Sequence, residues 1–105
     1  MPKDCAVPHE VVWSRPAHDD IAELFDYVAE HESIRDANHL CDRLLTATEH
    51  LARFPRLYEA APEYGAGVRR ISLMGHHVLY AIDDPAQRVT VLAVVSQRQN
   101  PHPIR

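Results

Sequence analysis

The chain has 105 residues, of which 46% are apolar and 25% are charged, and its formal net charge is −4. This length suits one domain with a real core, and this composition excludes a generally disordered protein. No apolar run approaches the roughly 20 residues that a membrane-spanning helix needs, so we expect no membrane partner.

The N-terminal stretch and the cysteines indicate the compartment. The first ten residues, MPKDCAVPHE, lack the apolar core of a secretory signal. Cys5 and Cys41 form no CxxC pair, which is typical of free thiols in a reducing environment. We therefore expect a cytoplasmic protein that folds as a single domain over residues 1–105.

Acidic and basic residues are unevenly distributed along the chain. Residues 1–64 carry thirteen Asp or Glu and six Lys or Arg, whereas residues 65–105 carry two Asp and five Arg. The second part is therefore mildly basic, at +3, on an acidic protein. General nucleic-acid binders usually have dense Lys and Arg clusters, so we expect no direct DNA binding. The mildly basic part suits the docking of an acidic peptide at least as well.

The first 14 residues predict a tail followed by a strand. Residues 1–8 contain two prolines and no periodicity, and we expect them to be a flexible tail. His9–Ser14 (HEVVWS) is short, β-branched and aromatic, which favours a first strand.

Two helices joined by a short break follow. Ser14 can cap the first helix, and Pro16 lies in its first turn, where a missing N–H does no harm. Ser33, with Asp36 three residues on, begins the second helix, and Phe54-Pro55 ends it. Each helix has one apolar face: Ala17, Ile21, Leu24, Phe25 and Val28 in the first, and Ile34, Ala37, Cys41, Leu44, Thr48 and Leu51 in the second. Two such faces predict an antiparallel helical hairpin.

The remainder predicts a loop and then a sheet. Residues 55–67 hold two prolines and two glycines, which indicates a long loop of the kind that is often functional. Three β-rich runs follow, VRRISL, HHVLYAI and RVTVLAVV, separated by Met74-Gly75 and by Asp83-Asp84-Pro85. Short turns between β-rich runs favour an antiparallel three-stranded meander. The expected fold class is therefore α+β: a strand, a two-helix hairpin and the meander.

Motifs for a metal site, a cofactor or a nucleophile are missing. The eight histidines include no HExxH, and the adjacent His76 and His77 would point to opposite faces of a strand. No dinucleotide fingerprint, P-loop or GxSxG occurs, so we expect no cofactor and no metal. Four carboxylates on the first helix lie opposite its apolar face and are interpreted as solvated: Asp19, Asp20, Glu23 and Asp26.

An arginine, histidine and tyrosine group lies in the predicted sheet. Arg69, Arg70, His77 and Tyr80 could supply the cations and the acid–base pair of a metal-free ribonuclease. In the alternative interpretation, Tyr80 is a core residue with a hydrogen-bonded hydroxyl and the arginines solvate the sheet edges. From the residues alone we favour this alternative, because such surface residues are common.

The order of these elements resembles the RelE/ParE superfamily of bacterial toxins. The residues that carry the resemblance are WSRPAHDDIAELFDYVAEH, ATEHLARFPRL, GVRRISLMGHHVLYAIDD and VTVLAVVSQRQNP, so it runs from about His9 to Pro101. The resemblance implies the toxin of a type II toxin–antitoxin pair that inhibits growth and stabilises a plasmid or chromosome. It also implies a cognate antitoxin, small and DNA-binding, whose C-terminal segment wraps the toxin.

The target differs between two branches of that superfamily. The RelE and YoeB-like branch cleaves mRNA on the ribosome and typically has a catalytic arginine where His77 stands. This chain also lacks that branch's C-terminal tyrosine or His-Tyr, and it has a single lysine, Lys3. Its ending, VVSQRQNP, is more similar to the ParE branch, which inhibits DNA gyrase. The resemblance therefore favours a non-enzymatic gyrase inhibitor.

The resemblance also assigns candidate residues. As a gyrase inhibitor, the chain would bind its target or antitoxin through residues of the meander and its end: Arg69, Arg70, Tyr80, Gln97 and Arg98. As a ribosome-dependent endoribonuclease, it would use Arg69 or Arg70 with His77, Tyr80 and Arg98. A third hypothesis is an inactive relative that only binds its antitoxin. We expect the antitoxin segment in the groove between the helical hairpin and the sheet, pairing with sheet-side arginines.

Overall fold

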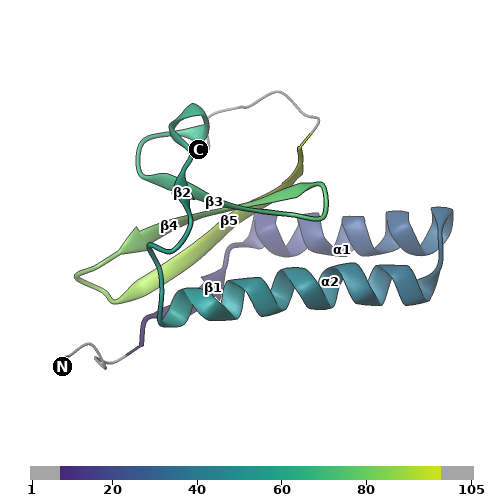
Figure 1. Cartoon of the computed structure of the whole chain (residues 1–105), viewed down its shortest axis with the longest axis horizontal. Helices are drawn as coiled ribbons and strands as arrows, with labels where there is room; N and C mark the ends of the chain where they lie inside the picture. The colour runs from purple at the N-terminus through teal and green to yellow at the C-terminus, as the bar shows by residue number, and fades with distance from the viewer. Residues whose placement is uncertain (1–7, 98–105) are drawn as a thin grey trace.

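The computed structural model describes residues 8–97 and shows two helices on one face of a sheet (Figure 1). The elements are β1 (Glu10–Trp13), α1 (Arg15–His31), α2 (Ile34–Glu49), β2 (Glu59–Ala60), β3 (Val68–Leu73), β4 (His76–Asp83) and β5 (Arg88–Ser96). Within the described residues the sheet has five strands in the order β1-β5-β4-β3-β2. The α+β class and its strand, hairpin and meander are as predicted. The tail predicted for residues 1–8 lies outside the described residues, except Pro8.

The helix starts are fixed by the predicted serine caps. The Ser14 Oγ accepts a hydrogen bond from the Ala17 N–H at 3.2 Å, and the Ser33 Oγ accepts one from the Asp36 N–H at 2.9 Å. The end of α2 differs from the prediction, because its regular turns stop at Glu49 and a 3-10 turn, His50–Ala52, follows. The chain tightens there, and the N–H groups of Arg53 and Phe54 both donate to the His50 carbonyl.

The main core lies between the helical hairpin and the sheet. Its buried residues come from both helices, the 3-10 turn after α2 and three strands: Ala17, Val28, Ala37, Leu40, Leu44, Ala47, Leu51, Ile71, Val78, Tyr80, Val89, Val91 and Val94. The predicted apolar faces of the helices supply much of this set. No helix in the described part of the chain is both long and apolar enough to cross a membrane.

A smaller core lies on the opposite face of the sheet. It consists of Ala61, Tyr64, Val68, Leu79 and Ala93. The segment predicted as a long loop supplies the first two, and it also contains β2 and a 3-10 turn, Pro62–Tyr64. β2 pairs with Arg69 and Arg70 of β3. Burying Tyr64 and pairing β2 therefore order a segment whose local sequence indicates only irregular structure.

β5 is apolar on both faces because it contributes to both cores, and an irregularity in its pairing decides which residues face each one. Leu79 pairs with Ala93 and Tyr80 pairs with Val91, so Leu92 is an extra residue in the β4–β5 ladder. The bulge shifts the alternation along β5, and Val89, Val91 and Val94 all enter the main core.

The two ends of β5 have different neighbours along one edge. β1 pairs with β5 in parallel, but only from Arg88 to Val91. Beyond Val91, this edge of β5 is hydrogen-bonded instead to Ser14, the N-cap residue of α1, and to Asp20 of α1. The Ser14 hydroxyl donates to the Leu92 carbonyl at 3.2 Å, and the Val94 N–H donates to the Asp20 carboxylate at 2.9 Å. α1 is thus fastened to the exposed part of a central strand.

Asp20 corrects the interpretation of the α1 carboxylates as a solvated face. It is half-buried against β5, and this burial raises the pKa of its carboxyl above the usual value. The hydrogen bond from Val94 N–H opposes the shift, and the neighbouring Asp19 adds to it. The physical reason for the error is that the partner of Asp20 lies 74 residues away in sequence.

We predict that Asp20→Ala lowers the free energy of unfolding by about 1–3 kcal/mol, because the Val94 N–H loses its acceptor. Asp20→Asn keeps an acceptor without a desolvated charge, so its stability at pH 7 should equal or exceed that of the wild type. Urea denaturation measures both, with Asp26→Ala on the exposed side of α1 as the control. Equal losses in Asp20→Ala and Asp20→Asn would contradict this role.

The same variants have a defined pH dependence. The folded-state pKa of Asp20 is raised, so the folded chain binds this proton before the unfolded chain does as the pH falls. The contribution of Asp20 to stability therefore increases as the pH falls through the folded-state pKa, and Asp20→Asn should lack this increase.

Candidate functional site

The sheet separates the predicted arginine, histidine and tyrosine group into two halves. Arg69 pairs with Tyr80 in the β3–β4 register, so both lie on the same face of the sheet. Arg70 and His77 lie on the opposite face. Tyr80 lies in the main core under the helices. The His77 ring contacts the edge of the Tyr64 ring, in the smaller core, at a centroid separation of 6.4 Å. Arg70 and His77 are therefore brought together, as are Arg69 and Tyr80, but the two pairs do not share a site.

Tyr80 is a core residue. Its side chain is fully buried, and its hydroxyl donates a hydrogen bond to the Pro55 carbonyl at 2.9 Å. Burial raises the pKa of its phenol despite the neighbouring Arg69 guanidinium. A phenol held in this way is poorly suited to proton transfer near neutral pH. The predicted contact of Tyr80 with a partner would require it to leave the core.

Both sheet arginines already have partners within the chain. The Arg69 guanidinium donates to the Tyr58 carbonyl. The Arg70 guanidinium pairs with Glu59 at 2.6 Å and with Glu63. Their roles in binding a target or antitoxin stay predictions, and each role would compete with an existing contact.

His77 lies beside Arg70 and forms a cross-strand pair with Ser72. Its Nδ1 is 2.9 Å from the Ser72 hydroxyl. Burial lowers the pKa of this imidazole, and the positive charge of Arg70 lowers it further. The described part of the chain holds no cluster of three or more His, Cys, Asp or Glu that could bind a metal ion.

Of the two binding residues predicted just after β5, the structure describes Gln97 but not Arg98. Gln97 is exposed, its N–H donates to the Gly75 carbonyl at 3.0 Å, and its side-chain amide lies 3.4 Å from the His76 carbonyl. Arg98 lies outside the described residues, so its proposed binding and catalytic roles stay predictions.

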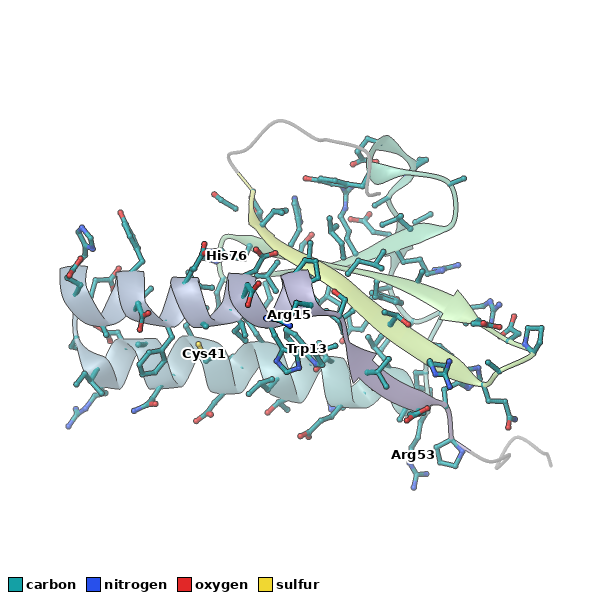
Figure 2. All side chains as sticks on the ribbon, turned by 180° about the vertical axis from the view of Figure 1, so that it is seen from behind. Trp13, Arg15, Cys41, Arg53 and His76 are labelled. Carbon is teal, nitrogen blue, oxygen red and sulfur yellow. The ribbon has the colours of Figure 1, made fainter. Side chains whose placement is uncertain are left out.

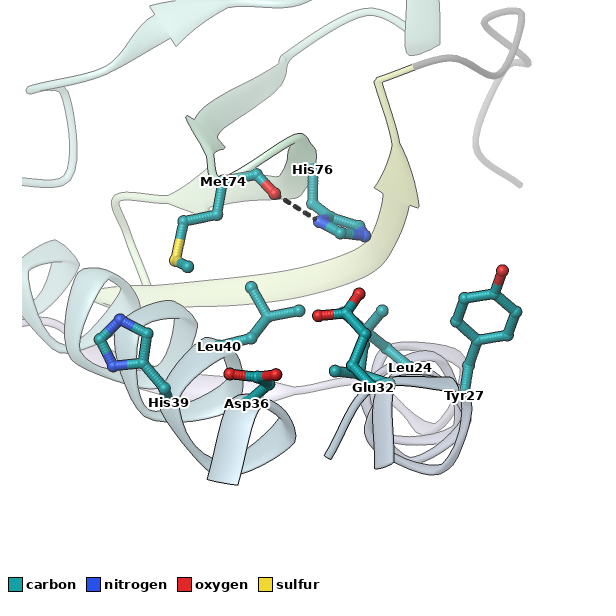
Figure 3. Close-up of a pocket in the computed structure, with 9 residues that line it drawn as sticks. Leu24, Tyr27, Glu32, Asp36, His39, Leu40, Met74 and His76 are labelled. Carbon is teal, nitrogen blue, oxygen red and sulfur yellow. Dashed lines mark hydrogen bonds between the residues drawn. The ribbon is translucent and has the colours of Figure 1, made fainter. Parts of the chain in front are cut away.

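The surface is hollowed at the other side of the molecule, between the far half of the helical hairpin and the β3–β4 turn. This hairpin groove has a volume of about 290 Å³. Its lining residues come from both helices and the turn: Leu24, Tyr27, Val28, Glu32, Asp36, His39, Leu40, Met74 and His76. Figure 3 shows Met74 and His76 facing Leu40, Asp36 and Glu32 across it. The His76 ring is held by a 3.0 Å hydrogen bond between its Nδ1 and the Met74 carbonyl.

A second hollow adjoins the first along α1 and the end of β5. This edge groove has a volume of about 590 Å³ and is lined by Asp20, Glu23, Leu24, Tyr27, His76, Val94, Val95 and Ser96. The two grooves share Leu24, Tyr27 and His76, which therefore form the ridge between them. Figure 2 shows His76 over α1 and far from Arg53, which lies near the other end of the hairpin.

The grooves combine exposed apolar side chains with carboxylates. Tyr27 is 59% exposed and Met74 is 45% exposed, both high for large apolar side chains. The acidic lining residues are Asp20, Glu23, Glu32 and Asp36, and no Lys or Arg among residues 8–97 lines either groove. The sequence predicted a groove between the helical hairpin and the sheet but not its acidic lining, because only tertiary packing brings the β3–β4 turn over α1.

The fold is that of a small α+β protein with two helices on one face of a five-stranded sheet, counted over the described residues. A family model described as the ParE toxin of the type II toxin–antitoxin system parDE matches residues 11–101. The chain therefore belongs to the ParE toxin family. Toxin ParE3 of Caulobacter vibrioides is 27% identical over 90 residues, which cover 86% of this chain and 88% of that protein.

Solved structures share the fold at low sequence identity. The chromosomal ParDE system of P. aeruginosa gives a TM-score of 0.75 at 14% identity and covers 87% of this chain and 98% of that one. The RelBE2 toxin–antitoxin complex of Mycobacterium tuberculosis gives 0.63 at 23% identity, covering 90% and 97%. A mutant of E. coli RelE in the free state gives 0.62 at 14% identity, covering 87% and 85%.

We predict that His77 makes the folded chain less stable in acid. Because its folded-state pKa is lowered from 6.5, the unfolded chain binds this proton first as the pH falls. The contribution of His77 to the free energy of unfolding should therefore be fully present above pH 6.5 and should be lost as the pH falls below it. The variant His77→Gln should lack this loss. Urea midpoints at pH 7.5, 6.0 and 5.0 measure the difference, with the exposed His50→Gln as the control. Parallel pH profiles for wild type and His77→Gln would contradict the prediction.

Proposed function

We propose that this chain inhibits DNA gyrase in the cytoplasm and is neutralised by a cognate antitoxin. The observation that carries the proposal is the family match over residues 11–101, which makes the chain a ParE-type toxin. Inhibition of gyrase by binding requires a surface and no catalytic residues. It therefore agrees with a sheet in which Tyr80 is buried and Arg70 is already paired with Glu59.

The antitoxin partner follows from the same relationship. Two structures with this fold are of a ParDE system and of a RelBE2 toxin–antitoxin complex. We propose for this chain a small DNA-binding antitoxin whose C-terminal segment wraps the toxin. The hairpin groove and the edge groove, with Tyr27 and Met74 exposed, offer an apolar surface for that segment.

A second candidate function rests on Arg70 and His77. These two residues lie together on the face away from the helices, where the His77 imidazole has a lowered pKa and a hydroxyl partner in Ser72. An imidazole can act as a general acid or base, and a neighbouring cation can stabilise charge on a phosphate, so this pair would supply part of a metal-free ribonuclease site. Against it, Glu59 and Glu63 neutralise Arg70, and Tyr80 is buried on the other face.

We predict that purified protein at micromolar concentration blocks supercoiling by gyrase or traps gyrase-cleaved DNA, and that added antitoxin reverses the effect. Agarose gels of relaxed plasmid measure both. If Gln97 and Arg98 contact the target, Gln97→Ala and Arg98→Ala should weaken inhibition several-fold, whereas the exposed helix variant Arg35→Ala should not. No effect at micromolar excess would count against a gyrase target.

The ribonuclease alternative has its own readout. Primer extension on translated message would show cuts within codons, and these would disappear in His77→Ala or Arg98→Ala. If expression of the chain neither slows growth nor produces cuts, the chain is an inactive relative that only binds its antitoxin.

A further inference from the structure

We propose that the hairpin groove and the edge groove together bind an antitoxin segment that carries Lys or Arg beside its apolar anchors. This inference rests on the proposed antitoxin partner and specifies its chemistry. It replaces the expectation from the sequence that an acidic segment pairs with sheet-side arginines.

The first argument is the charge of the grooves. Four carboxylates line them, and within the described part of the chain no Lys or Arg does so. The other titratable side chains of the linings are His39, His76 and Tyr27. An acidic segment would bring like charges together here, which costs binding free energy, whereas Lys or Arg would be attracted.

The second argument is that the sheet arginines already have acceptors within the fold, although only Arg70 is paired with carboxylates. Arg70 is held by Glu59 and Glu63, and Arg69 by the Tyr58 carbonyl. An acidic segment would have to displace these contacts to gain its own. Recognition through carboxylates in the grooves requires no such exchange.

The apolar residues place this segment along α1. Leu24, Val28 and Leu40 contribute apolar lining to the hairpin groove, and the exposed Tyr27 and Met74 stand at its margin. Apolar anchors at the centre surrounded by charged residues are the usual anatomy of a protein interface. The partner segment therefore needs large apolar side chains between its cations.

The spacing of the carboxylates sets the length of the segment. Asp20 lies in the edge groove and Glu32 lies at the far end of the hairpin groove, twelve positions later. At 1.5 Å per residue this separation is roughly 18 Å along α1. A helical partner segment of about 12 residues spans that distance. We therefore place a cation near each end of the segment.

The test uses the full-length chain and the antitoxin encoded beside its gene. The double variant Glu32→Lys/Asp36→Lys reverses two groove charges. The control, Asp26→Lys/Glu30→Lys, makes the same net change at exposed α1 positions outside both groove linings. Urea midpoints verify that each variant folds, and calorimetry measures the dissociation constant for the antitoxin.

We expect the groove variant to weaken antitoxin binding about 10- to 100-fold and the control to change it less than about 3-fold. Raising salt from 50 to 300 mM should weaken wild-type binding and affect the groove variant less. Replacing the facing antitoxin cations by Glu should restore affinity for the groove variant.

Three outcomes would overturn the proposal. Tighter or unchanged binding by the groove variant would mean that the segment is acidic or docks elsewhere. A wild-type dimer that the same charge reversal dissociates would assign the grooves to a second copy of this chain. If deletion of residues 98–105 makes antitoxin binding much tighter, the grooves would be assigned to the chain's own C-terminus. The gyrase assay is independent of all three, so the failure of one function does not decide the other.

Discussion

The architecture depends on how the exposed edge of β5 is completed. β1 pairs with β5 only as far as Val91. Beyond it, the Leu92 carbonyl binds the side chain of Ser14, which caps α1, and the Val94 N–H binds the side chain of Asp20 on α1. An unsatisfied strand edge at this place would be costly to bury and prone to pairing with other chains. The two contacts fix α1 along β5, and α2 then covers the rest of the same sheet face (Figure 1). The grooves exist because α1 follows this line.

Local sequence signals were sufficient for the two helix starts, β1 and the three strands of the meander, but not for β2 or the end of α2. Ser14 and Ser33 mark the helix starts because a serine hydroxyl binds an N–H three residues on, which depends on no distant residue. Strand alternation likewise separates His77 from Tyr80, since residues three apart in a strand point to opposite faces. The split of the proposed ribonuclease group was therefore already contained in the sequence pattern.

Other features could not be predicted, because they depend on contacts between distant segments. The polar position of Asp20 indicates a solvated carboxylate unless the path of β5 is known. The partners of Arg70 come from a stretch whose prolines and glycines indicate only a loop. The extra residue Leu92 in β5 is visible only in the β4–β5 register. In each case tertiary packing overrides the local signal.

These distant contacts also decide which charges remain available to a partner. The C-terminal part of the chain is basic by count, yet Arg69, Arg70 and Arg88 all have acceptors within the fold. The carboxylates around Tyr27 lie instead at the margin of an open apolar surface. The count of arginines in this part of the chain therefore does not equal the number of cations free to bind a partner, because Arg70 and Arg88 are already paired with carboxylates. Specificity between related toxins and antitoxins would then depend on the sign of the groove charge, since a like-charged segment is rejected even when its apolar anchors fit.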